Sequence, residues 1–271
     1  MVALVELEDW NGLIKDRNDD FNDLRMTALL ATGGNSFARP FLAAADDGRS
    51  YWVKCIDTCP QPSKMSVAIE HIVSNVGRLI NAPVCESNLI RIPEELAGWP
   101  LGKGHLQAGL AHASLALSKV IERRPALASR TRDDNPRRQV GVYAMWDWCF
   151  GSDPQWLYDL DNDESVYSHD HGLYLPSNDG CWERRYLVQC ADEPNELPDA
   201  PRDLNEEAVE EVSVALEKIN RDALVNILCG VPASWPVSNG DLEALGWFLE
   251  YRAPSVASRI RALVGREVKS R

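Results

Sequence analysis

The sequence predicts an α+β fold in two lobes, a small β-rich lobe over residues 1–92 and a larger, mostly helical lobe over residues 93–271. In the first lobe, short apolar runs are separated by turns that contain glycine, which is typical of β-hairpins. In the second lobe, the chain after Asn205 repeats apolar residues at helical spacing. Residues 93–104 are the predicted connection between the two lobes.

The predicted first lobe is centred on a β-hairpin. Its strands are expected at residues 41–45 and 51–56, and the turn between them at residues 46–48. A second turn is expected before the hairpin, because glycine tolerates left-handed backbone angles. This second turn consists of Gly33, Gly34, Asn35 and Ser36.

An amphipathic helix is predicted directly after the hairpin, over residues 63–80. Its apolar residues recur near the helical period, and Pro83 ends it shortly afterwards. Glu70 lies in the middle of this helix, beside the apolar stripe. Residues 84–92 are then expected to form another strand, the last element of the first lobe.

The second lobe is predicted to begin with helical structure. Residues 113–138 are expected to form a helix followed by a loop rich in Arg, Pro and Asp, and residues 140–150 have the apolar density of a buried helix. The arginines between Arg123 and Arg138 are interpreted as part of a solvated loop rather than a docking site. The remaining elements are two short strands around an acidic turn, at residues 155–158 and 165–169, and three helices at residues 206–220, 221–228 and 241–264.

Composition narrows the possible partners. The net charge of −13 and the pI of about 4.9 argue against binding to nucleic acid or to an anionic membrane as the main task. No apolar run reaches the length of a membrane span, and the first 20 residues are too acidic for a signal peptide. The seven cysteines are scattered without CxxC spacing, which favours reduced thiols in a cytoplasmic protein.

Four residues form a set whose order along the chain indicates phosphoryl transfer. Lys54 lies on a strand after the glycine turn, Glu70 on the next helix, and Asp153 and Asp170 lie much later. This chemistry needs a cation for the phosphates, carboxylates for magnesium and a carboxylate that orients the attacking hydroxyl. Each residue alone also has a structural interpretation: a solvated strand lysine, a surface helix glutamate, a turn aspartate before proline and a structural aspartate.

Two neighbouring patterns are weaker. The alternating aspartates of residues 159–163 resemble the start of a calcium loop, but Glu164 stands where that loop needs glycine. His169 and His171 flank Asp170, and they are interpreted as poor partners for one zinc ion. A hairpin tip is therefore the prediction for the acidic turn, and Asp170 is interpreted as a magnesium ligand rather than as part of a zinc site.

Six stretches, in this order along the chain, resemble the HipA-like kinases, in particular their short, single-domain bacterial members. They are Thr32-Gly33-Gly34-Asn35-Ser36 with Pro40, residues 46–54, Glu70 with residues 79–84, residues 148–153, Asp170-His171-Gly172, and residues 231–235. That family lies in the protein-kinase-like superfamily, near its phosphoinositide-3/4-kinase-like branch. The resemblance covers residues 26–264 and implies a two-lobed protein-kinase-like fold.

The resemblance also implies roles for individual residues. The glycine turn, Gly33 to Ser36, would cover the phosphates of ATP, and Lys54 would contact them with Glu70 as its partner. Asp153 would be the catalytic aspartate and Asp170 the ligand of Mg²⁺. The loop departs from the family pattern: Gly151 stands in place of an asparagine, Pro154 replaces an arginine, and Gln155 is the nearby amide left to carry an oxygen to the metal.

The resulting prediction is an ATP- and Mg²⁺-dependent phosphotransferase that acts on a serine or threonine of a protein substrate. One alternative is a pseudokinase, weak or inactive, that binds nucleotide or a partner protein, and the departures at Gly151, Pro154 and Gln155 favour it. A further alternative is a small-molecule kinase, which uses the same site with another acceptor. No direct binding of nucleic acid and no membrane association are expected.

Overall fold

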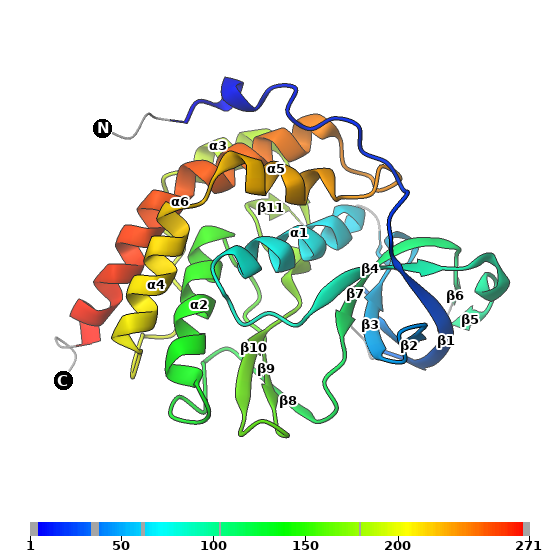
Figure 1. Ribbon diagram of the computed structural model, residues 1–271, viewed down its shortest axis with the longest axis horizontal. Helices are drawn as coiled ribbons and strands as arrows, with labels where there is room; N and C mark the ends of the chain where they lie inside the picture. Colours follow the sequence, from blue (N-terminus) through cyan, green and yellow to red (C-terminus); the bar gives the residue numbers. More distant parts are fainter. Residues whose placement is uncertain (1–4, 34–37, 61–62, 103, 179, 268–271) are drawn as a thin grey trace.

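The computed structural model places a β-barrel beside a group of helices (Figure 1). It describes residues 5–33, 38–60, 63–102, 104–178 and 180–267. The predicted turn residues Gly34, Asn35 and Ser36 lie outside the described residues. Within this part of the chain, no helix is long and apolar enough to cross a membrane.

The barrel is closed by five strands in the order β1-β2-β3-β7-β4. Neighbouring strands are antiparallel except β1 and β4, which pair in parallel. Alternate residues of each strand point inward, as the pleat requires, so that Phe41, Ala43 and Ala45 of β2 are buried while their neighbours are partly exposed. The five strands are β1 (Leu24–Thr32), β2 (Phe41–Ala45), β3 (Ser50–Lys54), β4 (Ser87–Ile92) and β7 (Gly109–Leu115).

The predicted β-hairpin is confirmed as β2 and β3. The two strands pair from Phe41 opposite Val53 to Ala44 opposite Ser50. Gly48 closes the turn with a φ of 79°, a conformation that favours glycine. The Tyr51 hydroxyl donates a hydrogen bond of 2.6 Å to Asp47 Oδ2, which ties the turn to the strand.

The predicted amphipathic helix is confirmed as α1 (Ser66–Leu79). Its apolar stripe, with Ile69, Ile72 and Val73 fully buried, packs into the core shared by the helices. In Figure 1 the helix lies between the barrel and the large helices. This position brings the middle of α1, and therefore Glu70, close to the end of β3.

The prediction for residues 113–138 is wrong in its first part. A helix was expected there, but the chain forms β7 and then β8 (Val120–Arg123), and the next helix begins only at Asn135. The Ala- and Leu-rich composition of residues 109–115 favours a helix locally. Ala111 and Ala113 instead fill the narrow barrel interior, because β3 and β4 offer hydrogen-bonding partners on both sides of β7.

Helices dominate the rest of the chain, and the four helices expected there are confirmed. A small sheet of order β10-β9-β8 lies below them, with β9 (Trp156–Asp159) and β10 (Ser165–Ser168) as the two predicted strands around the acidic turn. A short helix, α3, was not expected. The helices are α2 (Asn135–Trp148), α3 (Arg184–Cys190), α4 (Glu206–Glu217), α5 (Arg221–Cys229) and α6 (Asn239–Glu267).

Short elements connect these parts. The single-turn 3-10 helices are η1 (Leu7–Trp10), η2 (Ile56–Thr58), η3 (Ser63–Met65), η4 (Glu94–Leu96) and η5 (His171–Leu173). Two small ribbons pair β5 (Pro100–Leu101) with β6 (Gly104–His105), and β11 (Ser177–Asn178) with β12 (Cys181–Trp182).

The N-terminal segment runs along the C-terminal helices before it enters β1 (Figure 1). Trp10 is fully buried, and its indole nitrogen donates to Glu250 Oε2 of α6 at 2.7 Å. Arg17 donates to the carbonyl oxygens of Val231, Pro232 and Val237 at 2.6–2.9 Å. The beginning and the end of the chain are thus joined by side-chain contacts.

The described residues form two hydrophobic clusters, one inside the barrel and one among the helices. Helix α1 packs with the second cluster, although it precedes β4 in the chain. The predicted boundary after residue 92 coincides with the end of β4, while the barrel strand β7 lies beyond it. The division into lobes 1–92 and 93–271 stays a prediction.

Candidate active site

A cavity of about 600 Å³ lies where the barrel, α1, β8, the loop after α2 and η5 meet. The predicted site residues of the described chain all line it, although they come from five different parts of the sequence. They are Gly33, Lys54, Glu70, Asp153, Gln155 and Asp170. The remaining predicted residues, Gly34, Asn35 and Ser36, are those outside the described part.

Lys54 joins two carboxylates in one wall of the cavity. Its Nζ lies 2.6 Å from Glu70 Oε2 and 2.5 Å from Asp170 Oδ1. Lys54 is the last residue of β3, where the strand leaves the barrel facing α1. The side chain of Glu70 is 3% exposed and that of Lys54 is 12% exposed, whereas Asp170 is 29% exposed and so remains accessible to a ligand.

Lys54 and Glu70 stay charged despite burial, because each stabilises the charged form of the other. Burial alone would lower the pKa of Lys54, but Glu70 and Asp170 raise it above its ordinary value. Burial alone would raise the pKa of Glu70, but Lys54 and the His171 ring hold it well below its ordinary value. His171 Nδ1 lies 3.4 Å from Glu70 Oε1, so Glu70 has a partner on each oxygen.

The backbone at the end of β10 aims Asp170 at Lys54. Asp170 has φ 57° and ψ 54°, a left-handed conformation that aspartate tolerates better than most residues. Gly172 follows in η5, and a Cβ there would lie 3.2 Å from the Ser66 carbonyl oxygen of α1. The absence of a side chain at this position therefore lets η5 approach α1 closely.

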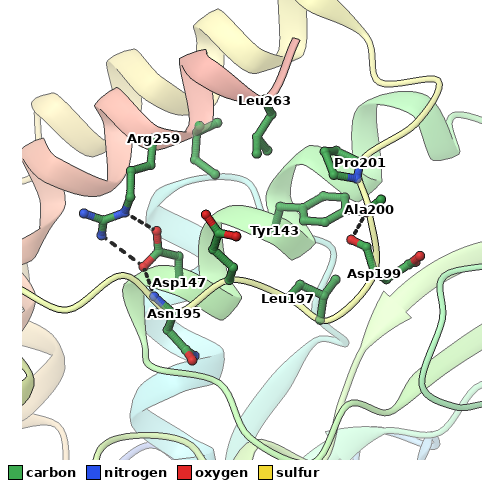
Figure 2. Close-up of a pocket in the computed structure, with 11 residues that line it drawn as sticks. Tyr143, Asp147, Asn195, Leu197, Asp199, Ala200, Pro201, Arg259 and Leu263 are labelled. Atoms are coloured by element: carbon green, nitrogen blue, oxygen red, sulfur yellow. Dashed lines mark hydrogen bonds and ion pairs between the residues drawn. The ribbon is translucent and has the colours of Figure 1, made fainter. Parts of the chain in front are cut away.

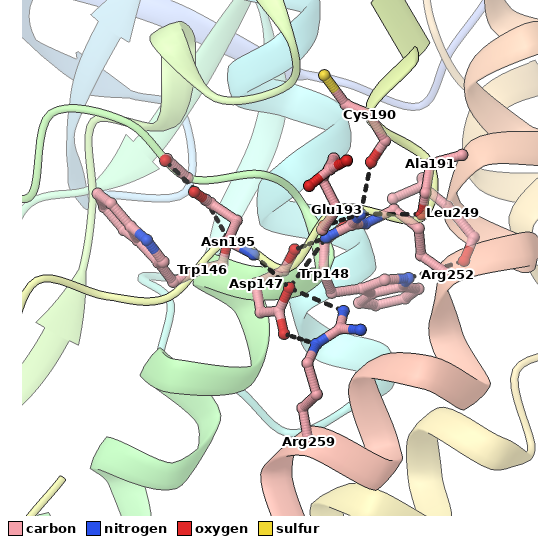
Figure 3. A network of polar contacts seen from close by, with 11 residues as sticks. Trp146, Asp147, Trp148, Cys190, Ala191, Glu193, Asn195, Leu249, Arg252 and Arg259 are labelled. Atoms are coloured by element: carbon pink, nitrogen blue, oxygen red, sulfur yellow. Dashed lines mark hydrogen bonds and ion pairs between the residues drawn. The ribbon is translucent and has the colours of Figure 1, made fainter. Parts of the chain in front are cut away.

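Close packing explains why Gly151 departs from the family pattern. A Cβ at this position would overlap the ring of Trp146 in the last turns of α2. Asn195 secures the same turn, because its Nδ2 donates to the carbonyl oxygens of Gly151 at 2.9 Å and Trp146 at 3.1 Å (Figure 3). The loop that carries Asp153 is thus held against α2 without an asparagine of its own.

Asp153 also lines the cavity, and two polar partners hold its carboxylate. Gln155 Nε2 donates to Asp153 Oδ2 at 2.6 Å, and Arg124 Nη1 donates to Asp153 Oδ1 at 3.2 Å. Arg124 also donates through Nε to Glu122 Oε1 at 2.7 Å. The side chain of Asp153 is 40% exposed, which leaves it accessible from solvent.

Glu122 and Arg124 were missed by the sequence interpretation. Both line the cavity, although Arg124 belongs to the arginine-rich stretch that was predicted to be a solvated loop. The remaining arginines of that stretch do point away, as Arg130 does in its ion pair with Asp199. Only the alternation of side chains along β8 would have indicated the orientation of Glu122 and Arg124.

His169 is a further cavity residue with an unusual environment. Its Nε2 is buried and makes no hydrogen bond to the described residues. Burial lowers the pKa of His169 to about 4, so the ring is neutral at pH 7. His171 lies in the interior between Glu70 and Ser168, and neither histidine lies on the expected strand, because β10 ends at Ser168.

The donor set suits a magnesium ion better than a transition metal. Within the described part of the chain, no three His, Cys, Asp or Glu side chains are grouped to hold one metal ion. Asp170 and Asp153 offer carboxylate oxygens to the cavity, and Gln155 carries an amide oxygen. Magnesium is commonly held by one or two carboxylates together with substrate phosphates and water, which fits this arrangement.

A buried ionic network supports the loop of Asp153 from behind (Figure 3). Arg252 of α6 is fully buried and contacts Asp147 Oδ1 at 2.9 Å, and Arg259 contacts Asp147 Oδ2 at 2.6 Å. Asp147 also accepts a hydrogen bond from the Asn195 backbone nitrogen at 3.0 Å. Because Asn195 binds Gly151, the network connects α6 to the loop that carries Asp153.

A second cavity of about 310 Å³ borders this network (Figure 2). Its lining includes Tyr143 of α2, Leu197, and Leu263 of α6, together with the Asp147–Arg259 pair. The charged groups at its base are already partnered, and its walls are largely apolar. None of the predicted site residues that the structure describes lines it.

Comparison with known proteins gives a family match for part of the chain. Residues 29–153 match the family model of HipA-like kinases. This stretch contains Lys54, Glu70 and Asp153, and the resemblance predicted from the sequence is confirmed. No curated protein matches the chain by sequence.

Solved structures give a likeness of fold. The Helicobacter pylori proinflammatory kinase CtkA superimposes with a TM-score of 0.57 at 12% identity, over 93% of this chain and 98% of that chain. A Golgi casein kinase with Mn and ADP bound gives a TM-score of 0.48 at 9% identity, over 97% of this chain and 77% of that one. The likeness to CtkA shows that the mixed α/β fold is kinase-like.

Proposed function

Starting from the match of residues 29–153 to HipA-like kinases, we propose that this chain transfers the γ-phosphoryl group of ATP to a serine or threonine of a protein. The family match and the kinase-like fold support phosphoryl transfer. The observation that carries the proposal is Lys54, held between Glu70 and Asp170 in the wall of a cavity of about 600 Å³. This is the ion pair and metal carboxylate that a kinase site requires.

In this proposal the residues that line the cavity have separate roles. The ammonium of Lys54 binds phosphate oxygens, and Glu70 keeps that ammonium in position. Asp170 and Gln155 would hold Mg²⁺ through oxygen atoms. When bound, the ion would neutralise negative charge on the phosphates.

Asp153 acts as the base in the transfer step. Its carboxylate accepts the proton of the acceptor hydroxyl, while that hydroxyl oxygen forms a bond to the γ-phosphorus. The bond between the γ-phosphorus and the bridging oxygen breaks, and its electron pair leaves with ADP. The 40% exposure of Asp153 gives a protein side chain access to it, and Gln155 fixes its second oxygen.

The experiment combines ATP titration calorimetry, with and without Mg²⁺, with transfer of label from γ-labelled ATP to the chain itself or to a panel of proteins. We expect Mg²⁺-dependent binding and transfer that Asp170→Ala abolishes while circular dichroism stays unchanged. Asp163→Ala, which changes an exposed aspartate of the acidic turn, is the matched control and keeps both activities. Unchanged transfer by Asp170→Ala would contradict the site.

A second candidate is a pseudokinase that binds nucleotide or a partner without turnover. The observation that favours it is Gln155, whose amide nitrogen, 2.6 Å from Asp153, occupies the carboxylate that would serve as base. The two candidates differ in one measurement. Mg²⁺-dependent ATP binding with no label transfer to any protein or small-molecule acceptor would select the pseudokinase.

A further inference from the structure

We propose that Arg124 is a phosphate-binding residue of the cavity. Its guanidinium supplies positive charge beside the loop of Asp153, which lacks the metal-binding asparagine of the family pattern. This inference rests on the proposed function and concerns how the same site receives the nucleotide. The argument uses the position of Arg124, its contacts and the balance of charge in the cavity.

The position of Arg124 follows from the strand that precedes it. β8 is the edge strand of the sheet β10-β9-β8, and its side chains alternate between two faces. Val120, Glu122 and Arg124 line the cavity. Arg123 takes the other face, where its guanidinium lies over the ring of Tyr158. Arg123, the last residue of β8, and Arg124, which directly follows it, therefore have different surroundings, and Arg123 serves as a control.

The contacts of Arg124 leave it able to bind a further anion. Its Nη1 and Nε donate to Asp153 and Glu122, whereas a guanidinium has five N–H donors. Its side chain is 47% exposed, so the remaining donors are open to a ligand. Burial would lower the pKa of Arg124, but Glu122, Asp153 and the more distant Asp170 raise it, so the group stays charged.

The balance of charge explains why a phosphate chain needs this arginine. Among the described residues that line the cavity, the acidic side chains are Glu70, Glu122, Asp153 and Asp170, and the basic side chains are Lys54 and Arg124. Lys54 is committed to two of these carboxylates. A triphosphate entering this surplus of negative charge needs cations, and an Arg–phosphate contact is one of the stronger ones available.

The loop of Asp153 supplies no cation of its own, and Arg124 lies next to it. Gly151 cannot carry a side chain beside Trp146, Pro154 carries no charge, and Gln155 turns its nitrogen to Asp153. The guanidinium of Arg124, directly after β8, reaches the same carboxylate from a different part of the chain. Lys54 and Arg124 thus approach the cavity from the sides of Asp170 and Asp153.

Binding of phosphate would change the partner of Asp153. The Arg124–Asp153 pair is exposed on both sides, and such pairs are weak, so its exchange for a phosphate contact is easy. Arg124 then holds the phosphate, and the Oδ1 atom of Asp153 becomes available to the acceptor hydroxyl. The nucleotide itself thereby prepares the base.

The test compares ligands that differ only in phosphate. Adenosine, ADP and ATP are titrated by calorimetry at fixed salt and Mg²⁺ into the wild-type chain, Arg124→Ala, Arg124→Gln and Arg124→Lys. We expect Arg124→Ala and Arg124→Gln to weaken ATP binding about tenfold or more and ADP binding less, while adenosine binding stays unchanged. Arg124→Lys keeps part of the ATP affinity, and Arg123→Ala keeps all of it.

Three outcomes overturn the inference. The first is wild-type ATP affinity in Arg124→Ala and Arg124→Gln, which would make Arg124 a partner of Glu122 and Asp153 only. The second is an equal loss for adenosine and ATP, which would indicate a deformed cavity. The third, no binding of ATP to the wild-type chain, contradicts the proposed function as well, so the two failures are distinguishable.

Discussion

The charge of Lys54 stabilises carboxylates on two elements other than its own strand. Its ammonium satisfies Glu70 of α1, which is almost fully buried, and Asp170 at the start of η5. Removing one partner of a buried ion pair leaves an uncompensated charge, which costs about 3–5 kcal/mol. We therefore expect Lys54→Met to lower the free energy of unfolding by about that amount, measured by urea denaturation.

The matched experiment uses the partner and an exposed pair. Lys54→Met combined with Glu70→Gln removes both buried charges and recovers part of the lost stability. Lys119→Met breaks an exposed contact with Asp161 and changes stability by less than about 1 kcal/mol. Equal effects of Lys54→Met and Lys119→Met would show that the Lys54 contacts do not stabilise the fold.

Chemical type and order selected Lys54, Glu70, Asp153 and Asp170 as candidates, and the structure brings all four to the lining of one cavity, while their roles stay predictions. Arg124 was not found, since the arginine-rich stretch to which it belongs was interpreted as a solvated loop. What distinguishes it is its side of β8, and β8 itself was not predicted. The contacts of a side chain on a strand cannot be known before the strand and its register are known.

Among the elements, those with strong periodicity were predicted well. Helix α1 and the hairpin of β2 and β3 have a regular apolar pattern and clear end signals. Strand β7 was missed because its alanines signal a helix locally, whereas the small bore of the barrel requires them in a strand. Short apolar runs of this kind are decided by their tertiary partners.

The contact between η1 and α6 depends on a glycine. The ring of Trp10 lies so close to Gly246 that a Cβ at position 246 would overlap it. We expect Gly246→Ala to lower the free energy of unfolding by about 1–3 kcal/mol through overpacking, despite the better helix propensity of alanine. Thermal unfolding monitored by circular dichroism measures the effect.

Gly240 gives the control for that substitution. It lies at the start of the same helix, and the nearest atom to a Cβ there is Ser238 Oγ at 3.9 Å. Gly240→Ala is therefore neutral or slightly stabilising. If Gly246→Ala were equally neutral, the docking of Trp10 on α6 would have to be looser than described here.

Across the molecule, buried histidines link the barrel, α1 and the cavity. His71 of α1 and His112 of β7 lie with their Nδ1 atoms 3.5 Å apart. Burial lowers the pKa of His71 to about 4 and that of His112 to about 3, and it lowers the pKa of His169 in the cavity to about 4. All three rings are therefore neutral in the folded chain at pH 5–7.

This environment makes stability depend on pH. Between about pH 6.5 and pH 4 the unfolded chain binds protons at these histidines and the folded chain does not, so stability falls as the pH falls. Each histidine contributes a slope of up to about 1.4 kcal/mol per pH unit. Urea denaturation between pH 7 and pH 5, above the range in which Glu70 is protonated, measures the slope.

Substitution of one histidine tests the origin of that slope. His112→Gln removes one titrating group and flattens the dependence on pH, although it also lowers stability at pH 7. His105→Gln, which changes an exposed histidine of β6, is the matched control for the substitution itself. A slope that persists undiminished in His112→Gln would assign the pH dependence to other groups.

The contacts of the N-terminal segment have a consequence for synthesis of the chain. Trp10 and Arg17 find their partners 240 and more than 200 residues later, in α6 and in the segment before it. On the ribosome these two residues are made more than 200 residues before their partners and cannot dock until those partners have emerged. The barrel strands, whose partners are closer in sequence, can assemble earlier. Docking of Trp10 on α6 is then among the last steps of folding, because it requires that α6 has already been synthesised.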